Sequence, residues 1–337
     1  MKQARLDKIL SRASAKRIVV IGDLMLDEFV WGKVGRISPE APVPVVQVTG
    51  ESFFPGGAAN VARNLREFVD HIVVIGIIGS DRGGRQLRTL LAEQKIDTAG
   101  IIEDSNFQTI VKTRVIAGHQ QVVRVDREQI RAPTTEQVTQ VTKKLRDLLP
   151  KVDAVIFEDY GKGFLSVELV RQICADARAA GKIVAADPNP RHPMEWRDAT
   201  VVKPNRAEAF LAAGVPRSDS NYPPDQDEDL IKVGATLLEK WDTKLLLVTL
   251  GEQGMMLFQK GAPPHHIPTK AQQVFDVSGA GDTAIALFTL ALCCDASPSE
   301  AAEIANHGSA VVVGKLGTAT ATADELRASF KNDASAG

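Results

Sequence analysis

The chain has 337 residues, of which 44% are hydrophobic and 24% are charged, and its formal net charge is -2. A chain of this length can bury a large core, and its balanced charge argues against a general nucleic-acid or membrane-surface binder, which would carry a basic surplus. No apolar run approaches the roughly 20 residues that span a bilayer, and the charged N-terminal segment is not typical of a signal peptide.

Cysteine usage indicates a reducing compartment. The chain has three cysteines, Cys174, Cys293 and Cys294. An odd count that includes two adjacent residues is no disulfide framework, so we expect a cytoplasmic protein. No Cys/His spacing typical of zinc occurs, and we expect His265 and His266, which follow two prolines, to lie in a loop.

Short β-branched runs alternate with longer amphipathic segments, which predicts buried strands between helices. We expect strands at residues 17–22, 71–79, 154–157, 183–186, 200–202 and 245–249. We expect helices at residues 58–69, 83–95, 135–149, 165–180, 206–213, 227–240, 280–294, 298–314 and 323–331. Repeated strand–helix units predict one α/β domain over residues 1–337, with a mostly parallel sheet and helices on both faces.

Two segments break this alternation, at residues 31–50 and 109–127. Apolar and polar residues alternate there, as in antiparallel strands outside a main sheet. Such strands at the ligand edge predict a lid. Because a small flap rarely buries itself alone, we expect its apolar face, with Val43, Val45 and Val48, to pack against a second subunit in a homodimer.

Carboxylates follow several of the predicted strands. Ligands of parallel sheets bind beyond the carboxyl ends of the strands, and Asp23 and Asp187 follow two of these ends. Asp23 and Asp27 are candidate ligands of sugar hydroxyls, because carboxylate oxygens accept strong hydrogen bonds; loop solvation or helix capping is the alternative. Glu158 and Lys162 end a further strand, where we expect contact with substrate and Lys162 could reach a phosphate.

Paired glycines precede the predicted helix at 58–69. Gly56 and Gly57 allow close approach to the backbone, and Asn60 offers both a donor and an acceptor, which suits a polyhydroxylated ligand. A plain helix start with small residues is the alternative for this motif alone.

A second glycine turn, at residues 276–282, leads directly into an apolar helix. Backbone N–H groups at such a helix start bind phosphates. A carboxylate at the same point, Asp282, would repel a phosphate unless it takes part in the chemistry. We expect phosphoryl transfer, in which the turn holds the migrating group and Asp282 takes the proton of the attacking hydroxyl. Helix capping by Asp282 is the alternative.

Two further segments suit a nucleotide. Asn205 and Glu208 have the spacing of a capping box, and they could instead order water around magnesium and nucleotide phosphates. The segment with Thr249, Gly251 and Gly254 is typical of a hairpin turn, and it could supply backbone donors to a phosphate. No Walker A or protein-kinase motif occurs, so a nucleotide site must be of another kind.

The lid segment at 109–127 carries several cations and amides. Arginine forks match phosphate geometry, which makes this segment a candidate for binding a substrate phosphate; a solvated strand face is the alternative. The candidates are Lys112, Arg114, Gln120, Arg124 and Arg127.

The glycine pair with Asn60, the Asn205–Glu208 pair and the segment 276–282, in chain order, resemble the ribokinase-like family of carbohydrate kinases over nearly the whole chain. The resemblance implies a three-layer α/β/α sandwich with a small β lid, and ATP and Mg²⁺ as co-substrate and cofactor. It implies the following site residues: Asp282 as catalytic base, the N–H groups of Gly279, Ala280 and Gly281 as anion hole, Asp27 and Asn60 as sugar ligands, Asn205 and Glu208 for magnesium through water, and Gly251, Gly254 and Asn306 in the nucleotide pocket.

That family usually has threonine where this chain has Val277, a position that we expect to be tolerant. By the same analogy a monovalent cation can bind near the late glycine turn.

A finer resemblance lies in residues 36–45, 120–126 and 312–318. These segments are similar to the heptose-7-phosphate kinases of bacterial lipopolysaccharide synthesis. The similarity implies phosphorylation of the C1 hydroxyl of D-glycero-β-D-manno-heptose 7-phosphate by ATP, on the way to ADP-heptose. Many relatives carry a second nucleotidyltransferase domain with an H-x-G-H motif, which this chain lacks, so we expect the kinase step alone.

Two alternatives to a heptose-phosphate kinase stay open. One is a kinase of the same family that acts on ribose, fructose 6-phosphate or a nucleoside. The other is a non-catalytic regulator that binds sugar or nucleotide.

Overall fold

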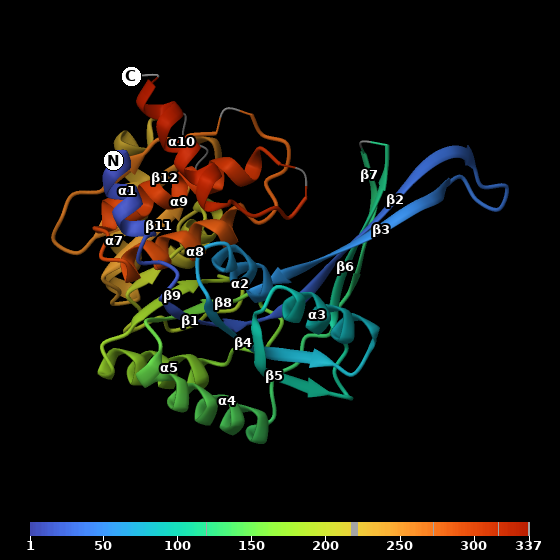
Figure 1. The fold of residues 1–337 in the computed structure, drawn as a ribbon, viewed down its shortest axis with the longest axis horizontal. Helices are drawn as coiled ribbons and strands as arrows, with labels where there is room; N and C mark the ends of the chain where they lie inside the picture. The colour runs from blue at the N-terminus through green and yellow to red at the C-terminus, as the bar shows by residue number, and fades with distance from the viewer. Residues whose placement is uncertain (119, 217–221, 272, 316, 336–337) are drawn as a thin grey trace.

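The computed structural model describes residues 1–118, 120–216, 222–271, 273–315 and 317–335, whose strands form a larger and a smaller sheet (Figure 1). The larger sheet contains, in spatial order, β13 (His265–Ile267), β12 (Met255–Gln259), β11 (Leu245–Thr249), β10 (Val201–Val202), β9 (Ile183–Asp187), β8 (Ala154–Glu158), β1 (Arg17–Gly22), β4 (His71–Gly79) and β5 (Asp97–Asp104). Neighbouring strands from β11 to β5 run parallel, and β12 and β13 are antiparallel. The predicted mostly parallel sheet is confirmed.

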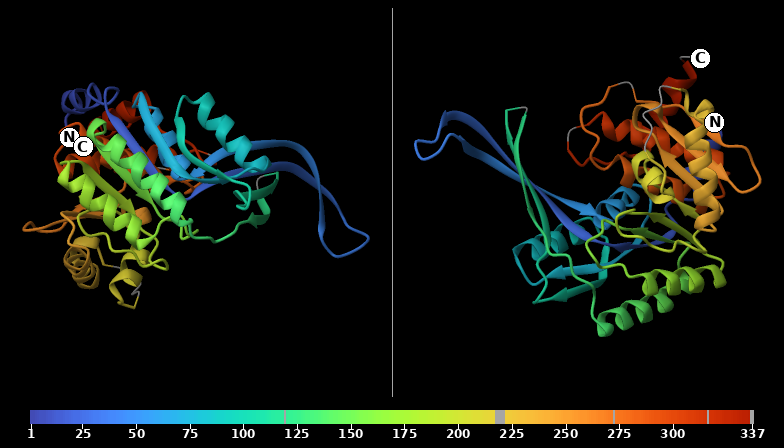
Figure 2. Two further views of the ribbon diagram at one scale, coloured as in Figure 1. Left: turned by 90° about the horizontal axis from the view of Figure 1, so that it is seen from below. Right: turned by 180° about the vertical axis from the view of Figure 1, so that it is seen from behind.

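Helices cover both faces of the larger sheet (Figures 1 and 2). One face packs against α1 (Gln3–Leu10), α2 (Ala58–Arg66), α3 (Arg82–Glu93), α8 (Ala280–Cys293), α9 (Pro298–Val313) and α10 (Ala323–Ser335). The other face packs against α4 (Thr135–Leu148), α5 (Val167–Ala179), α6 (Arg206–Ala213) and α7 (Glu228–Lys240). No helix in these ranges combines the length and the apolar character that crossing a membrane requires.

The alternation of β1 shows how one strand supports both layers. Ile18 and Val20 belong to the first cluster of buried side chains, and Val19 and Ile21 belong to the second. Successive side chains of a strand point to opposite faces, so a continuous apolar run buries itself on both sides. The three-layer α/β/α sandwich is therefore confirmed.

The sequence pattern does not reveal α1, β5, β12 and β13. The prediction that His265 and His266 lie in a loop is wrong, because both belong to β13, where they pair with Leu257 and Met256. β13 lies at the edge of the sheet and buries only Ile267, so it lacks the apolar run by which strands are predicted.

The smaller sheet is the predicted lid, with strand order β3-β2-β6-β7. Its strands are β2 (Leu24–Ile37), β3 (Pro44–Gly57), β6 (Ile110–Ala117) and β7 (Gln120–Arg127). They extend from the body as a long arm whose two hairpins diverge at their far ends (Figures 1 and 2). The lid strands reach further into the body than the predicted segment 31–50, because β2 begins directly after Asp23 and β3 ends at Gly57.

Candidate active site

The turn that leads into α8 is fixed by an aspartate and a glycine. The carboxylate of Asp276 accepts hydrogen bonds from the N–H of Ser278 (2.9 Å) and from the N–H of Gly317 (3.2 Å). Gly279 has a left-handed backbone (φ 81°), and a Cβ at this position would lie 2.9 Å from Nδ2 of Asn60. The turn thus delivers the start of a helix, where backbone N–H groups and the helix dipole favour an anion.

Asp282 lies in the first turn of α8, and both of its oxygens accept hydrogen bonds from other elements. Nδ2 of Asn60 donates to Oδ2 at 2.6 Å, and the hydroxyl of Tyr160 donates to Oδ1 at 3.1 Å. The N-cap position of α8 is Gly279, so Asp282 does not serve as the cap. Burial, reinforced by Asp187, raises the pKa of Asp282 to about 6. Such a carboxylate is ionised at neutral pH and remains basic enough to accept a proton.

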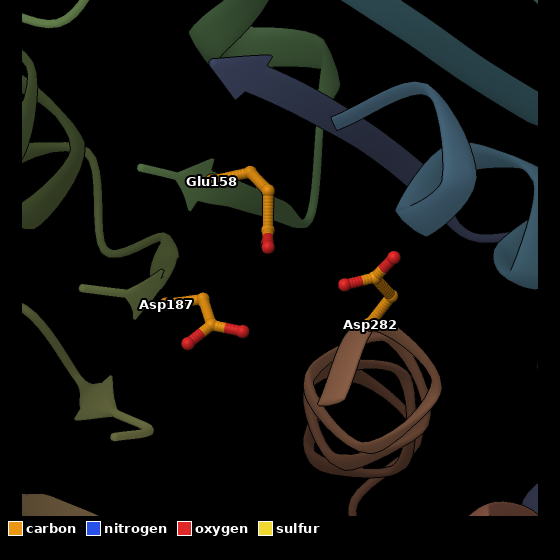
Figure 3. A group of neighbouring side chains, drawn as sticks. All are labelled: Glu158, Asp187 and Asp282. Carbon is orange, nitrogen blue, oxygen red and sulfur yellow. The ribbon is translucent and has the colours of Figure 1, made fainter. Parts of the chain in front are cut away.

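Two further carboxylates converge on Asp282 at the carboxyl ends of neighbouring strands (Figure 3). Glu158 ends β8 and Asp187 ends β9, and one oxygen of each lies within 4.8 Å of the others and of an Asp282 oxygen. Burial and the two aspartates raise the pKa of Glu158 well above its ordinary value, and Oε2 of Glu158 has no hydrogen-bond partner among the described residues.

A buried lysine balances part of this negative charge. Nζ of Lys203 lies 2.8 Å from Oδ2 of Asp187, and the lysine is 2% exposed. Burial raises the pKa of Asp187 to about 6 even though Lys203 opposes the shift. A Cβ on Gly281 would lie 3.4 Å from Nζ of Lys203, so the ammonium adjoins the glycine turn. The three carboxylates suit a hard divalent cation, and the ammonium of Lys203 suits a phosphate.

Two adjoining cavities lie beside the glycine turn. The first, about 780 Å³, is lined by the carboxylate cluster and by Lys203, Asn205 and Glu208. The second, about 460 Å³, has mainly apolar walls that include Val274, Ala310 and Val313. Both cavities share the following lining residues: Thr249, Gly251, Val277 and Gly281. A polar chamber joined to an apolar one at a glycine turn could accommodate a ligand with a phosphate end and an apolar end.

The predicted nucleotide residues line these cavities. Asn205 and Glu208 form a capping box, in which Oδ1 of Asn205 accepts from the N–H of Glu208 (2.9 Å) and Oε2 of Glu208 accepts from the N–H of Asn205 (2.8 Å). Gly251 and Gly254 lie in the turn between the antiparallel strands β11 and β12, so the hairpin interpretation is confirmed. Nδ2 of Asn306 donates to the carbonyl of Pro268 at 2.6 Å beside the second cavity.

The predicted sugar residues gather where the lid joins the body. Asn60 is fully buried, and Asp27 is 5% exposed and paired with Arg114. A Cβ on Gly56 would lie 2.6 Å from Oδ2 of Asp27, and Gly57 has a left-handed backbone (φ 58°). The glycine pair therefore makes room for the strand that carries Asp27.

Asp23 has a different contact from the predicted one. Its carboxylate accepts hydrogen bonds from the backbone N–H groups of Tyr160 (2.9 Å), Lys162 (3.0 Å) and Phe164 (3.3 Å). These donors occupy three acceptor positions of a buried side chain, so Asp23 holds the loop after β8. Its role as a sugar ligand stays a prediction.

The lid cations divide between the two faces of the lid sheet. Arg114 and Arg124 are cross-strand partners on one face, and Arg114 reaches Asp27. Arg127 is paired with Val111 on the other face, and its guanidinium contacts Thr113 at 3.1 Å. The three arginines, which the sequence prediction treats alike, therefore lie on two different faces of the lid.

The remaining predicted phosphate ligands lie at different distances along the lid. Gln120 begins β7 at its far end, and Arg124, half exposed, pairs with Asp126 at 2.9 Å. Lys162 lies in the loop after β8, and its Nζ is 2.6 Å from Oε2 of Glu128. Lys162 is thus nearer the body than Gln120.

Sequence reasoning missed Tyr160 and Lys203 as site residues. Tyr160 stands inside the segment from Glu158 to Lys162, and Lys203 directly precedes Pro204 and Asn205. Their positions at strand ends were available as a signal. Their partners, Asp282 and Asp187, come from other elements, so the contacts could not be read from spacing.

Comparison with known proteins identifies the family. The pattern of the pfkB family carbohydrate kinases matches residues 15–325. The chain belongs to this family. It is therefore a carbohydrate kinase, a phosphotransferase with an alcohol group as acceptor, as the resemblance in the sequence implies. The glycine turn and Asp282 lie within the matched residues.

Curated relatives of this family member are longer than the chain. It is 42% identical over 322 residues to "Bifunctional protein HldE" of Magnetococcus marinus, an alignment that covers 95% of the chain and 65% of the relative. It is 39% identical over 326 residues to the protein of the same name in Geobacter sulfurreducens, covering 97% and 65%. The chain thus spans about two thirds of the length of these relatives.

Solved structures share the fold at low sequence identity. Phosphofructokinase-2 from Escherichia coli in complex with potassium has a TM-score of 0.76 and 18% identity, covering 94% of the chain and 99% of that structure. Arabidopsis thaliana ribokinase complexed with ribose and ATP has a TM-score of 0.70 and 19% identity, covering 94% and 99%. The ribokinase-like fold is thereby confirmed.

Proposed function

We propose that the chain phosphorylates the C1 hydroxyl of D-glycero-β-D-manno-heptose 7-phosphate with ATP, giving the 1,7-bisphosphate for ADP-heptose synthesis. The observation that carries a phosphoryl-transfer role is the position of Asp282, ionisable near pH 6 and adjoining the glycine turn. The heptose assignment rests on the resemblance of three lid and C-terminal segments to heptose-7-phosphate kinases, and relatives named HldE support it.

In the proposed reaction the acceptor oxygen forms a bond to the γ-phosphorus of ATP while the bond from that phosphorus to the β–γ bridging oxygen breaks. Asp282 takes the proton of the acceptor hydroxyl, and ADP leaves with the bridging oxygen. The N–H groups of Gly279, Ala280 and Gly281 stabilise the charge on the transferred group, and Lys203 lies beside Gly281 to assist.

ATP would lie across the two cavities, with its base in the apolar chamber. Thr249, Gly251, Gly254 and Asn306 line that chamber, which supports their assignment as nucleotide ligands. Mg²⁺ would neutralise phosphate charge, held through water by Asn205 and Glu208, whose carboxylate and amide oxygens suit a hard cation. A monovalent cation near the late glycine turn is a further proposal, which the potassium complex of Escherichia coli phosphofructokinase-2 supports by analogy of fold.

The sugar would lie between the lid base and Asp282. Asp27, Asn60 and the backbone at Gly56 and Gly57 are the proposed ligands of its hydroxyls, and Glu158 would line the reacting end. The 7-phosphate would contact Lys162 and Arg124, with Gln120 as a further proposed ligand at the far end of β7. Glu128 and Asp126, which now pair with Lys162 and Arg124, would be displaced by the phosphate.

The whole chain would work as one kinase unit in a homodimer joined through the lids. Val43 and Val48 are 51% and 54% exposed, and exposed apolar patches often mark protein–protein contact surfaces. A cytoplasmic location is proposed, because Cys174, Cys293 and Cys294 are all free thiols buried in the core.

An ADP-release assay tests the proposed function. Heptose 7-phosphate is offered beside ribose, fructose 6-phosphate and adenosine at equal concentration, with ATP and Mg²⁺. We expect the highest kcat/KM on heptose 7-phosphate. A higher kcat/KM on another acceptor would change the proposed substrate and leave the kinase assignment in place. No ADP release with any acceptor would favour the non-catalytic alternative.

A further inference from the structure

The catalytic base has one side-chain donor on each oxygen. Asn60 on α2 donates to Oδ2 of Asp282 at 2.6 Å, and Tyr160 after β8 donates to Oδ1 at 3.1 Å. A single donor leaves a carboxylate free to rotate about its bond to Cβ. Donors from two different elements, one on each oxygen, fix the plane of the carboxylate and so the direction of its remaining lone pairs.

Tyr160 is itself fixed by its backbone. Its N–H and that of Lys162 donate to the buried carboxylate of Asp23. Between them Gly161 has a left-handed backbone (φ 67°), and its N–H donates to Oδ1 of Asp159 at 2.8 Å. These hydrogen bonds hold the loop, and with it Tyr160, in one position before any ligand binds. The buried carboxylate of Asp23 therefore serves to fix this loop.

A cation from the lid covers the ring of Tyr160. Nζ of Lys112, on β6, lies 5.1 Å from the centre of the ring. An ammonium over an aromatic face is attracted to it, and it draws electron density from the phenol, which makes the hydroxyl a stronger donor. Lys112 is aligned with Asp27 of β2 and Asp126 of β7, which keep it on the inner face of the lid.

We propose that Tyr160 is a positioning residue for the base Asp282, and that Lys112 makes this positioning depend on the lid. The inference rests on the proposed kinase function and adds a contact between the lid and the base to it. With the lid against the body, the ammonium strengthens the hydrogen bond that orients Asp282. Without that contact the base is less well oriented, so transfer to the sugar is favoured when the lid is in place.

The charged groups around Asp282 determine what a pH profile reports. They are Glu158 at the end of β8, Asp187 at the end of β9 and Lys203 beside β10, with Tyr160 and Asn60 as donors. A hydrogen bond to the ionised carboxylate favours the ionised form. Removal of the Tyr160 hydroxyl therefore raises the pKa of Asp282 and moves the acid limb of activity to higher pH.

The test is Tyr160→Phe, measured as kcat against pH at saturating substrates. We expect kcat to fall about 10-fold, the acid limb to move up by about half a pH unit, and the KM for ATP to stay within about twofold. Tyr222→Phe is the matched control, because Tyr222, the other of the two tyrosines, is 67% exposed. It is expected to behave as the unmodified protein does.

A double variant shows whether the tyrosine acts through the base. Tyr160→Phe in an Asp282→Asn background is expected to cost less than twofold in kcat, because the group that it orients is gone. A further loss of about 10-fold in that background would overturn the proposal. The proposal would also be overturned if the unmodified protein is active and Tyr160→Phe leaves the acid limb of its pH profile unchanged.

The lid contribution is tested with Lys112→Met and Lys112→Arg. The methionine keeps the length but removes the charge, and we expect kcat to fall about threefold with the acid limb moving in the same direction. Arginine keeps a cation over the ring and is expected to restore the profile. Equal losses in both variants would overturn the role of the cation.

One measurement does not depend on turnover. The titration of the Asp282 side-chain carboxyl is followed by ¹³C NMR with labelled aspartate, with Asp282→Asn for assignment. We expect Tyr160→Phe to raise this pKa in the free protein. If no acceptor releases ADP and the pKa still rises, the proposed function fails and the positioning contact stands; an unchanged pKa overturns the contact itself.

Discussion

The edge of the larger sheet at the carboxyl ends of β8 and β9, which we call the body edge, and the lid differ in how they place their charged side chains. At the body edge the carboxylates of Glu158, Asp187 and Asp282 lie close together, with Asp187 partly buried and the other two buried, and Lys203 is a buried partner. In the lid Arg124 and Asp126 pair at a half-exposed surface. Buried charges interact strongly with one another, and removing them from water costs folding free energy. Exposed ion pairs contribute little to stability. We infer that the body edge performs the chemistry at a cost in stability, and that the lid charges serve binding.

The largest effect is expected from Asp282→Asn. The asparagine keeps the size of the side chain and removes the base, so turnover should fall by about 10²–10⁴-fold while ATP binding is retained. Turnover is measured by ADP release and ATP binding by calorimetry. Turnover within about twofold of the unmodified protein would contradict the assigned role.

Glu158→Gln tests whether the body edge stores unfavourable charge. Burial raises the folded-state pKa of Glu158, so the stability from its protonated form is present below the unfolded-state pKa and is lost as the pH rises through the folded-state value. We expect the glutamine to raise the free energy of unfolding by about 2 kcal/mol at pH 8 and to leave it unchanged at pH 4. Denaturant melts at both pH values measure this.

The matched control for Glu158→Gln is Glu93→Gln at the exposed end of α3. It should leave the free energy of unfolding unchanged at both pH values, because an exposed carboxylate keeps its hydration. An equal gain at pH 4 and pH 8 for Glu158→Gln would mean that packing, and not charge, separates the body edge from the lid.

The features that could be predicted from the sequence are those that leave a local pattern in the chain. Asp282, Gly279 and Asn60 could be predicted because backbone conformation and a helix start leave a local pattern of glycines and polar residues. The parallel sheet could be predicted because its strands bury both faces and read as continuous apolar runs. β13 could not be predicted, because an edge strand with one buried residue has no continuous apolar run.

The contacts between elements could not be predicted. Nothing in the spacing says that Tyr160 donates to Asp282 or that Lys203 pairs with Asp187. The position of Asp23 after a strand does not show that its carboxylate accepts backbone hydrogen bonds from a loop about 140 residues later in the chain. Alternation along β7 could have separated Arg124 from Arg127, because odd and even positions face opposite sides.

Arg124→Ala tests the binding role of the lid. We expect the KM for the phosphorylated sugar to rise about 10-fold with the KM for ATP unchanged, because an arginine fork that meets a phosphate is lost. Arg127→Ala is the matched control, on the same strand but on the other face. Initial rates at varied sugar and ATP measure both constants. An equal change in the KM for the sugar and the KM for ATP would contradict the proposed contact between Arg124 and the phosphate.

The smallest effect on the subunit itself is expected from Val43→Asp with Val48→Asp. Both side chains are more than half exposed, so their replacement should change the free energy of unfolding of a subunit by less than about 0.5 kcal/mol. In a dimer joined through the lids, the same aspartates would be buried without partners and would weaken association. Light scattering at micromolar concentration should therefore give the mass of a dimer for the unmodified protein and of a monomer for the variant. A monomeric mass for both would show that the lid leaves its apolar face to water, and the contrast between body and lid would then rest on ligand binding alone.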